Sequence, residues 1–331
     1  SSEFPLSFRS RLLSRCWATW LRLEERIVFR LATSVIAVTP YLRRAILEDY
    51  GLASQVVRFI PNAVDCERFS PQIRAVEGFG GKKEWKVISG GSFQPWHGAF
   101  DLPGIAKELL QRGVAARFLL VGSGPTLPAV LYRAKRLAVR DMFVLLGSVP
   151  NRMMPEILHD ADLCIYTPER SKYVTRIGLC ALKVLEWMAA AKPIISYSVP
   201  GLNDLLGHGA GILVPSGNAT EVADAIVRLT RNPAFAKQLG AEARRRACSH
   251  YDWKNVADRI LGVIEDARVK GPPSLLRIAP SLLLVIPEIV AITLRRRLRT
   301  ISGIGLGSRK IYHFMKRDKE GKPWSSRSKC L

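Results

Sequence analysis

The chain has 331 residues, which is enough for one large or two modest domains, each able to bury a hydrophobic core. Its 50 lysine and arginine residues outnumber its 28 aspartate and glutamate residues, giving a formal net charge of +22. The six cysteines are scattered, with no CxxC pair and no metal-ligand spacing. This argues against a disulfide framework or a zinc site and favours free thiols in a reducing compartment.

The positive charge favours an anionic partner, which is a phosphorylated substrate, an anionic membrane surface or nucleic acid. It is concentrated in residues 295–331, where twelve lysine and arginine residues against Asp318 and Glu320 contribute +10 of the total. The longest apolar run, residues 279–294, is too short for a standard transmembrane span and contains Pro287 and Glu288. We therefore expect an interfacial or packed helix there.

The first part of the chain indicates a helix, then one βα unit and a further strand. Residues 8–31 place apolar side chains on one stripe with arginines between them, which predicts a basic amphipathic helix, either on a domain surface or in contact with a membrane. Residues 34–39 and 56–62 are predicted strands, and residues 41–50 are a predicted helix closed by Gly51. Because such a unit cannot form a domain alone, we expect it to be the last piece of one.

From residue 86 onward, predicted strands and helices alternate, which indicates a parallel sheet in a doubly wound α/β domain. Ligands of such sheets bind beyond the carboxyl ends of the strands. Three amphipathic helices follow at residues 218–230, 233–249 and 253–268, the first with Asn218 and Glu221 placed as a capping box, before a Gly-Pro-Pro break at 271–273. The alternating elements are strands 86–91, 117–122, 142–147, 162–167, 193–198 and 211–215, and helices 101–112, 126–139, 152–159 and one within 178–197.

The loops after these strands are rich in glycine and serine and run toward helix starts, where backbone N–H groups bind anions without a side chain. The loops GGSFQPWHG, GSGP and GSVPN together suit a diphosphate. A tight turn explains Gly122 and Gly124 equally well. Within residues 178–197, the sequence GLCALKVLEWMAAAKPIISY predicts a helix with one central carboxylate, Glu186, followed by a buried strand.

The motifs IPNAVD, VISGGSF with WHG, LLVGSGP, FVLLGSVP, DLCIYTPE, ALKVLEWMAAAKPII and GILVP follow one another in a characteristic order. From about residue 34 to residue 268, this order resembles the family 4 glycosyltransferases of the GT-B fold. The resemblance implies two Rossmann-like domains facing across a cleft, the second of which holds a nucleotide-diphosphate sugar without a metal or cofactor. It implies that residues 1–76 are the remnant and hinge of an N-terminally truncated acceptor domain, residues 77–270 the complete donor domain, and residues 271–331 a basic extension.

The same resemblance assigns the donor-binding residues. Glu186 matches the second glutamate of the family's E-x7-E motif, which is expected to accept hydrogen bonds from the ribose, and Gly178 stands where the first glutamate would be. Ser92 and His97 replace the usual arginine and lysine that neutralise the diphosphate. Further predicted donor contacts are Gly91, Gly98, Leu182 and Lys183 and, at the nucleotide base, Gly147, Ser148 and Val149. Asn62 and Asp65 match the hinge turn, although Ala63 replaces its glycine.

The two missing cations matter because the charge on a leaving diphosphate must be stabilised by donors that are already in place. His97, with an ordinary pKa of about 6.5, can donate a hydrogen bond, and a nearby phosphate favours its protonated form. Arg176 and Lys183 are further candidates for the charge. Since Lys183 precedes Glu186 by one turn, a salt bridge between them is an equally good interpretation.

The leading hypothesis is a retaining, metal-independent glycosyltransferase that moves a sugar from a nucleotide sugar to a glycan or lipid-linked acceptor. We expect a cytoplasmic protein held at an anionic membrane by its basic segments, with acceptor-side catalytic residues outside this chain, which alone is inactive. The alternative is a nucleotide-sugar-binding module without catalysis, because Ser92, His97 and Gly178 depart from the family pattern. Nucleic-acid binding is disfavoured, because aromatic residues form no stacking pattern among the basic ones.

Overall fold

The computed structural model describes residues 20–21, 24–72 and 84–271. Residues 24–31 are helical, as expected, but most of the predicted amphipathic helix lies outside the described residues. The apolar run 279–294 and the basic segment 295–331 lie outside them as well. The described residues from 28 to 271 belong to one compact unit.

A small parallel sheet with one helix precedes the main sheet. Strand β1 (Val35–Ala37) pairs in parallel with β2 (Val57–Phe59), and helix α2 (Pro40–Tyr50) connects them. The Thr39 side chain caps α2 by accepting a hydrogen bond from the N–H of Leu42, and Gly51 ends the helix in the left-handed conformation. These elements confirm the predicted βα unit followed by a strand.

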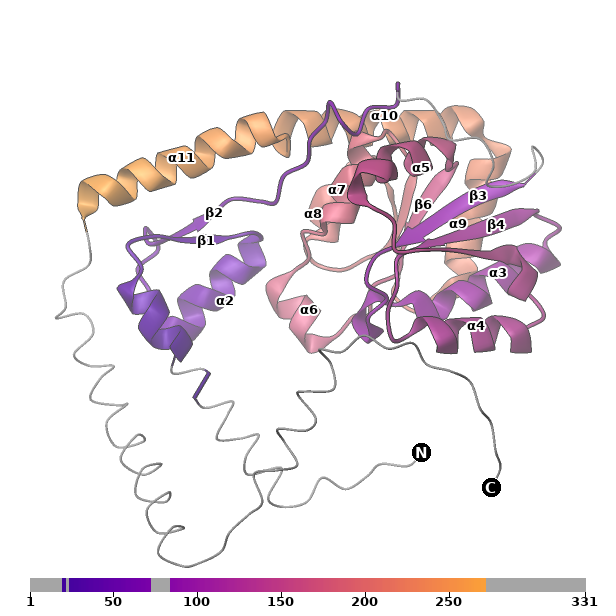
Figure 1. Cartoon of the computed structure of the whole chain (residues 1–331), viewed down its shortest axis with the longest axis horizontal. Helices are drawn as coiled ribbons and strands as arrows, with labels where there is room; N and C mark the ends of the chain where they lie inside the picture. Colours follow the sequence, from indigo (N-terminus) through magenta and orange to yellow (C-terminus); the bar gives the residue numbers. More distant parts are fainter. Residues whose placement is uncertain (1–19, 22–23, 73–83, 272–331) are drawn as a thin grey trace, which may run out of the picture. The chain divides into compact units, whose positions relative to one another are not determined.

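Six parallel strands form the main sheet in the order β5-β4-β3-β6-β7-β8. Figure 1 labels β3, β4 and β6 of this sheet. Helical crossovers connect the strands. Strands β4 and β5 are added on one side of β3, and the order then reverses because β6 pairs with the other edge of β3. This is the parallel α/β sheet that the alternating pattern predicted. The strands are β3 (Trp85–Gly90), β4 (Ala116–Val121), β5 (Phe143–Gly147), β6 (Leu163–Tyr166), β7 (Ile194–Tyr197) and β8 (Ile212–Val214).

Helices cover both faces of this sheet. Side chains alternate between the faces along each strand, so Ile88 and Cys164 contribute to one hydrophobic cluster and Val87 and Ile165 to the other. On the first face lie α5 (Met154–Asp160), α7 (Leu182–Ala189) and α8 (Leu202–Leu206), and on the second α3 (Leu102–Gln111), α4 (Leu127–Arg136) and α9 (Ala219–Arg231), while α10 (Pro233–His250) contributes to both clusters. Because central strands are buried on both sides, they are continuous apolar runs.

Two short helices were not predicted from the sequence, α6 (Lys172–Ile177) and α8. Helix α6 buries only Val174 and is capped by Ser171, so it has almost no apolar periodicity. Helix α4 ends at Arg136, before the predicted end at residue 139, because Ala138 takes a positive φ of 57°. The predicted capping pair is present, since Asn218 accepts a hydrogen bond from the N–H of Glu221.

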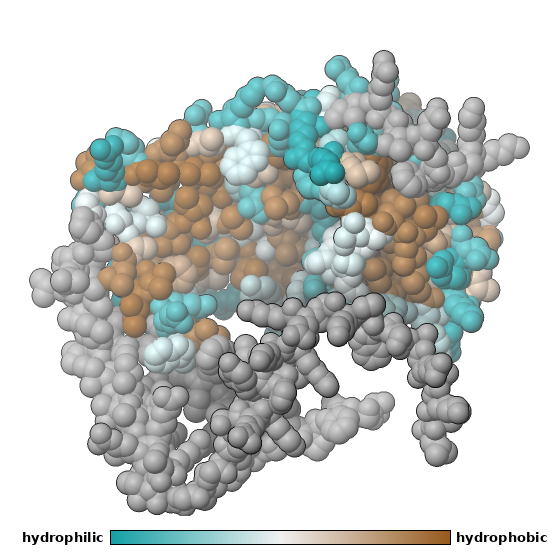
Figure 2. All heavy atoms as spheres, viewed as in Figure 1, coloured by the Kyte–Doolittle hydropathy of each residue, from teal (hydrophilic) through white to brown (hydrophobic). Residues whose placement is uncertain are grey.

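Residues 60–72, which we call the connecting segment, lead from the small sheet to the main one, and α11 (Trp253–Lys270) runs back along them. Ile60 and Ala63 pack against Val256 and Val263 of α11. Apolar side chains remain exposed on the small sheet and on α11, and they include Ile36, Phe59, Leu261 and Ile264. Figure 2 shows that apolar residues gather over several parts of the face in view. A two-stranded sheet is only marginally stable alone, and α2 supplies its core, with Ile46 in one cluster with Ala37 and Val57.

Candidate functional site

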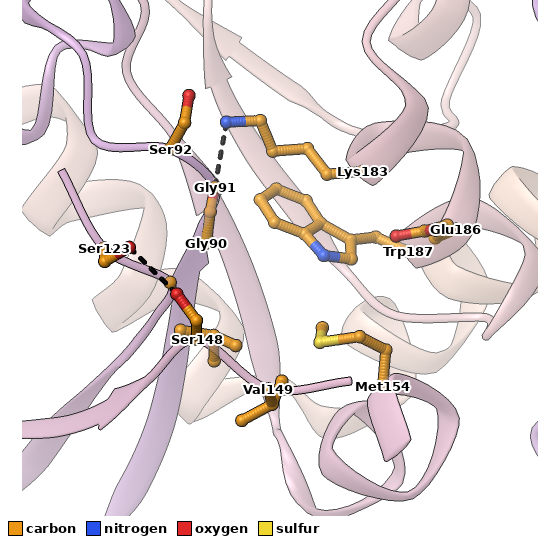
Figure 3. Close-up of a pocket in the computed structure, with 12 residues that line it drawn as sticks. Gly90, Gly91, Ser92, Ser123, Ser148, Val149, Met154, Lys183, Glu186 and Trp187 are labelled. Atoms are coloured by element: carbon orange, nitrogen blue, oxygen red, sulfur yellow. Dashed lines mark hydrogen bonds between the residues drawn. The ribbon is translucent and has the colours of Figure 1, made fainter. Parts of the chain in front are cut away.

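An open cavity of about 360 Å³ lies at the carboxyl ends of β3, β4 and β5, where the sheet order reverses (Figure 3). Helix α7 forms its opposite wall. The structure brings six of the predicted donor residues together here. The lining residues are Gly90, Gly91, Ser92, Val121, Gly122, Ser123, Ser148, Val149, Met154, Lys183, Glu186 and Trp187.

Two glycines allow the loops after β3 and β4 to pack backbone against backbone. A Cβ atom on Gly122 would lie 2.0 Å from the carbonyl oxygen of Gly91, and one on Gly124 would lie 2.0 Å from that of Ser92. Both distances are far inside van der Waals contact. These glycines therefore do more than form a tight turn, because they set the shape of the cavity floor.

The loop after β5 forms the side of the cavity that lies away from α7. The hydroxyl groups of Ser123 and Ser148 are 2.8 Å apart and join the β4 and β5 loops (Figure 3). Gly147 does not line the cavity, but its positive φ of 67° turns the chain so that Ser148 and Val149 do. The side chain of Met154 adds apolar surface beside them.

Lys183 reaches from the first turn of α7 across to the end of β3. Its Nζ donates a hydrogen bond to the carbonyl oxygen of Gly90 at 2.8 Å and lies 4.0 Å from the centre of the Tyr166 ring. Burial lowers the pKa of Lys183 to about 8. The side chain does not form the salt bridge with Glu186 that sequence spacing allowed, because α7 aims it at the sheet.

His97 lies behind Gly91, at the end of a single 3-10 turn (Pro95–His97). In the described part of the chain its buried Nδ1 atom has no hydrogen-bond partner. Burial, and then the charge of Lys183, lower the pKa of His97 to about 4, so the imidazole is neutral at pH 7. The expectation of an ordinary pKa was wrong for this protein without a ligand. Gly98 packs so closely that its Cβ would lie 1.3 Å from the Thr167 carbonyl oxygen.

Glu186 is held by a side chain that the sequence did not single out. The Nδ2 of Asn151 donates a hydrogen bond to Glu186 Oε1 at 3.1 Å, and Arg68 NH2 donates to Asn151 Oδ1 at 2.5 Å. Burial raises the pKa of Glu186, and Asn151 and Arg68 oppose that shift. Asn151 belongs to the GSVPN loop that the sequence marked, but nothing local indicated its partner, and Arg68 lies 83 residues away.

Besides Gly147, His97 and Gly98, three further predicted charge or donor positions lie outside the cavity lining. Gly178 ends α6 with a φ of 66°, and a Cβ there would lie 2.7 Å from the Tyr41 ring, which occupies the adjacent space. Arg176 forms ion pairs with Asp49 and Glu48 of α2, so it does not supply charge to the cavity. Leu182 is exposed at the start of α7.

The first turn of α7 also presents backbone donors. Within the described residues, the N–H groups of Leu182 and Lys183 have no acceptor, and Ala181 provides no side-chain cap. Unpaired N–H groups at a helix start carry a partial positive charge. These donors lie at the same end of α7 as the Lys183 ammonium group, and of the two residues Lys183 lines the cavity.

The predicted hinge residues lie in the connecting segment and fix its path. Asn62 Nδ2 donates a hydrogen bond to the Cys180 carbonyl oxygen at 2.7 Å, which ties the segment to the chain just before α7. Asp65 Oδ1 accepts hydrogen bonds from the N–H groups of Glu67 and Arg68. Both side chains therefore contact backbone groups, and their role in a hinge stays a prediction.

The described residues contain no group of three or more His, Cys, Asp or Glu side chains arranged to hold a metal ion. The four cysteines in this part of the chain carry free thiols. In the same residues, no helix is long and apolar enough to cross a membrane.

Two protein-family models match this chain. Residues 86–232 match the family described as glycosyl transferases group 1, and residues 2–68 match glycosyltransferase family 4. N-acetyl-alpha-D-glucosaminyl L-malate synthase from Bacillus anthracis is 32% identical over 147 residues, or 44% of this chain and 36% of the relative. Phosphatidyl-myo-inositol mannosyltransferase from Mycobacterium leprae is 27% identical over 255 residues, or 75% of this chain and 62% of the relative. The chain thus spans less than two thirds of the length of either relative.

The fold is also similar to that of a solved structure. HepE from Anabaena, determined in complex with UDP and glucose, matches with a TM-score of 0.59 at 17% sequence identity, covering 70% of this chain and 63% of that protein. The main sheet thus has the Rossmann-like architecture of the GT-B fold. The two family models follow one another in the order that the motifs predicted, and this chain belongs to the family 4, group 1 glycosyltransferases.

Proposed function

We propose that the cavity binds the nucleoside diphosphate of a nucleotide sugar and that the protein transfers the sugar to an acceptor. The observation that carries this proposal is the placement of a carboxylate, Glu186, and an ammonium group, Lys183, on one wall of a cavity at the sheet's switch point. A nucleoside diphosphate sugar needs both, because its ribose hydroxyls donate hydrogen bonds while its diphosphate is an anion.

The diphosphate is proposed to lie between the first turn of α7 and Gly91. Lys183 Nζ and the unpaired N–H groups of Leu182 and Lys183 provide donors there, and the unpartnered His97 Nδ1 lies behind Gly91. In this proposal, these groups neutralise the diphosphate, as an arginine and a lysine are expected to do in the family at the positions of Ser92 and His97. Because the donors are fixed before the ligand arrives, they are suited to stabilise the charge on a leaving diphosphate.

The nucleoside is proposed to extend toward the β5 loop. Glu186 accepts hydrogen bonds from the ribose hydroxyls, and the backbone of residues 147–149 meets the base, with Met154 and Val149 providing apolar contact. HepE was solved in complex with UDP and glucose, which supports a nucleotide sugar as the ligand. We leave the base unassigned, because its proposed contacts are made by backbone groups.

The reaction proposed is transfer with retention at the anomeric carbon and without a metal ion, as family membership suggests. The acceptor is proposed to be a glycan or a lipid-linked molecule at the cytoplasmic face of a membrane. The name of the Mycobacterium leprae relative includes a phosphatidylinositol acceptor, which supports a lipid. The net charge of +22 supports contact with anionic lipid.

A second candidate is a binding module that holds a nucleotide sugar without transferring it. The specific observation in its favour is Gly178, whose neighbouring space is filled by the Tyr41 ring where the family's first glutamate would reach the sugar. Both candidates share the same cavity and differ only in the chemistry that follows binding.

Calorimetric titration with UDP, GDP, ADP and their glucose conjugates tests the shared part of the proposal. We expect micromolar binding of one nucleoside diphosphate, abolished in the variant Glu186→Ala combined with Lys183→Met. Absence of binding to every member of the panel contradicts both candidates. If binding is found, the assay that separates the candidates uses a protein that carries the acceptor-side residues as well. Release of the nucleoside diphosphate from its sugar conjugate by that protein, in the presence of membrane lipid extract, indicates an enzyme, and its absence favours the binding module.

A further inference from the structure

We propose that Arg68 and Asn151 are positioning residues that orient the Glu186 carboxylate toward the ribose and thereby link the connecting segment to the donor cavity. This inference rests on the proposed function of the cavity. The three side chains come from the connecting segment, the β5–α5 loop and helix α7, so they join separate parts of the chain at one point.

The Asn151 amide is the central member of this chain of hydrogen bonds. Its Oδ1 accepts from Arg68 NH2 at 2.5 Å, and its Nδ2 donates to Glu186 Oε1 at 3.1 Å. A flipped amide would place two donors against each other on the arginine side and two acceptors on the glutamate side, so only one orientation satisfies both neighbours. A positive group at one end and a negative group at the other polarise the amide in the same direction.

The backbone holds both positioning residues in place. Asp65 accepts a hydrogen bond from the Arg68 N–H at 2.9 Å, and the guanidinium group of Arg68 lies 5.4 Å from the centre of the Phe69 ring. Asn151 begins a single 3-10 turn (Asn151–Met153) that directly follows Pro150, whose φ is restrained. The backbone of both residues is therefore placed without a contact to Glu186.

A second contact joins the same two parts of the chain. The guanidinium group of Arg244 donates to the carbonyl oxygens of Cys66 and Phe69 in the connecting segment and to that of Ala189 at the end of α7. The connecting segment is thus fixed to α7 on both sides of Arg68. A movement of this segment would be transmitted to the helix that carries Glu186.

The consequence for Glu186 is a fixed carboxylate. Oε1 is engaged by Asn151, which restrains the side-chain torsions and leaves Oε2 for the ligand in the cavity. Without Asn151, the carboxylate would sample several rotamers and would have to be ordered by the ribose when the donor binds. Removal of Asn151 should therefore lower the affinity only for ligands that carry ribose hydroxyls.

The test compares a ribonucleoside diphosphate with its 2′,3′-dideoxy analogue, using the base that the wild-type protein prefers. We expect the wild type to bind the ribonucleotide more tightly, and Asn151→Ala and Asn151→Asp to reduce this preference by about five- to tenfold. Asn151→Asp keeps the shape but places a carboxylate against Glu186. Arg68→Met should give a smaller reduction of the same kind. The affinity for the dideoxy analogue should not change in any of these variants, which excludes a general loss of structure.

The control is Arg58→Met, which removes an exposed arginine that is paired with Asp266 on α11. It should leave the preference unchanged. In a Glu186→Ala background, Asn151→Ala should have no further effect on it. A wild type that binds neither nucleotide contradicts the proposed function itself. A wild type that binds without a preference, or an Asn151→Ala variant that keeps the full preference, overturns the inference while leaving donor binding intact.

Discussion

The Nζ atom of Lys183 lies 2.8 Å from the carbonyl oxygen of Gly90, and a Cβ atom on the next residue, Gly91, would lie 2.8 Å from the same Nζ. The ammonium group thus contacts the glycine backbone at the end of β3, where no side chain intervenes. Among the described residues its hydrogen-bond acceptor is a neutral carbonyl group, and the ion pairs found there do not include Lys183. An anion that enters the cavity meets a cation whose charge is not yet compensated.

Replacement of Lys183 by methionine should weaken nucleoside diphosphate binding by about 10- to 100-fold, the range for a lost charge-assisted hydrogen bond. The unliganded protein should not be destabilised, because the variant no longer buries a charged group that burial disfavours. Calorimetry gives the affinity, and thermal unfolding gives the stability. Lys254→Met is the matched control, since Lys254 is exposed and paired with Glu67. Equal affinities for Lys183→Met and wild type would exclude Lys183 from the diphosphate site.

Diphosphate binding should take up a proton at alkaline pH. The pKa of Lys183 is lowered by burial from 10.5 to about 8, so the group is largely neutral in the free protein at about pH 9, and a bound diphosphate restores its charge. Titration in buffers of different ionisation enthalpy should show proton uptake that is small at about pH 7 and approaches one proton at about pH 9. The Lys183→Met variant should show no such rise.

The same shift has a defined effect on stability without a ligand. Because the folded-state pKa lies below the unfolded-state value of 10.5, the unfolded chain binds more protons between pH 8 and 10.5. The contribution of Lys183 to the free energy of unfolding is therefore present above pH 10.5 and is lost as the pH falls through about 8. Urea denaturation measures the free energy of unfolding of the wild type and of Lys183→Met. Between pH 8 and 10.5, the value for the wild type should rise relative to that of the variant as the pH rises. A difference that is independent of pH would contradict the shift.

Replacement of Gly91 by alanine should destabilise the fold and weaken diphosphate binding together. Gly91 has a φ of 134°, and its new Cβ would contact Lys183 Nζ, so the lysine must move away from Gly90. We expect a loss of about 1–3 kcal/mol in unfolding free energy. Gly113→Ala is the matched control, because Gly113 also has a positive φ but nothing lies within 4 Å of its Cβ position. This variant should therefore lose only the unfolding free energy that comes from the strained backbone. Identical affinities for the two variants would show that the position of Lys183 does not matter for binding.

Restoring the family's first glutamate at Gly178 should not restore a sugar contact. The residue has a φ of 66° and its Cβ position lies 2.7 Å from the Tyr41 ring, so Gly178→Glu should lower the free energy of unfolding by about 2 kcal/mol or more. Part of this loss should be recovered in the double variant with Tyr41→Ala, as a double-mutant cycle measures. A Gly178→Glu variant as stable as the wild type would mean that α2 does not hold Tyr41 against this position.

The sequence predicted the sheet and the position of Glu186 because both depend on local patterns. The central strands are apolar runs bounded by turn residues, and α7 places apolar side chains on one stripe, so neither needs knowledge of a distant partner. The short helix α6 was not predicted, since it buries one residue and its position depends on contacts with α2. The amphipathic pattern at residues 8–31 and the basic segment remain predictions, because they lie largely outside the described residues.

By itself, the sequence determined the family, the parallel α/β fold and the helix that carries the Glu186 carboxylate. Only the tertiary structure decided what the charged side chains contact. Lys183 could pair with Glu186 by spacing along the helix, but the end of β3 lies closer to its Nζ, and Glu186 is held instead by Asn151 and, through it, Arg68. The pKa of His97 was likewise decided by burial and by Lys183, which the sequence places 86 residues away. Periodicity is a local property of a chain, whereas desolvation and hydrogen-bond partners depend on which distant segments pack together.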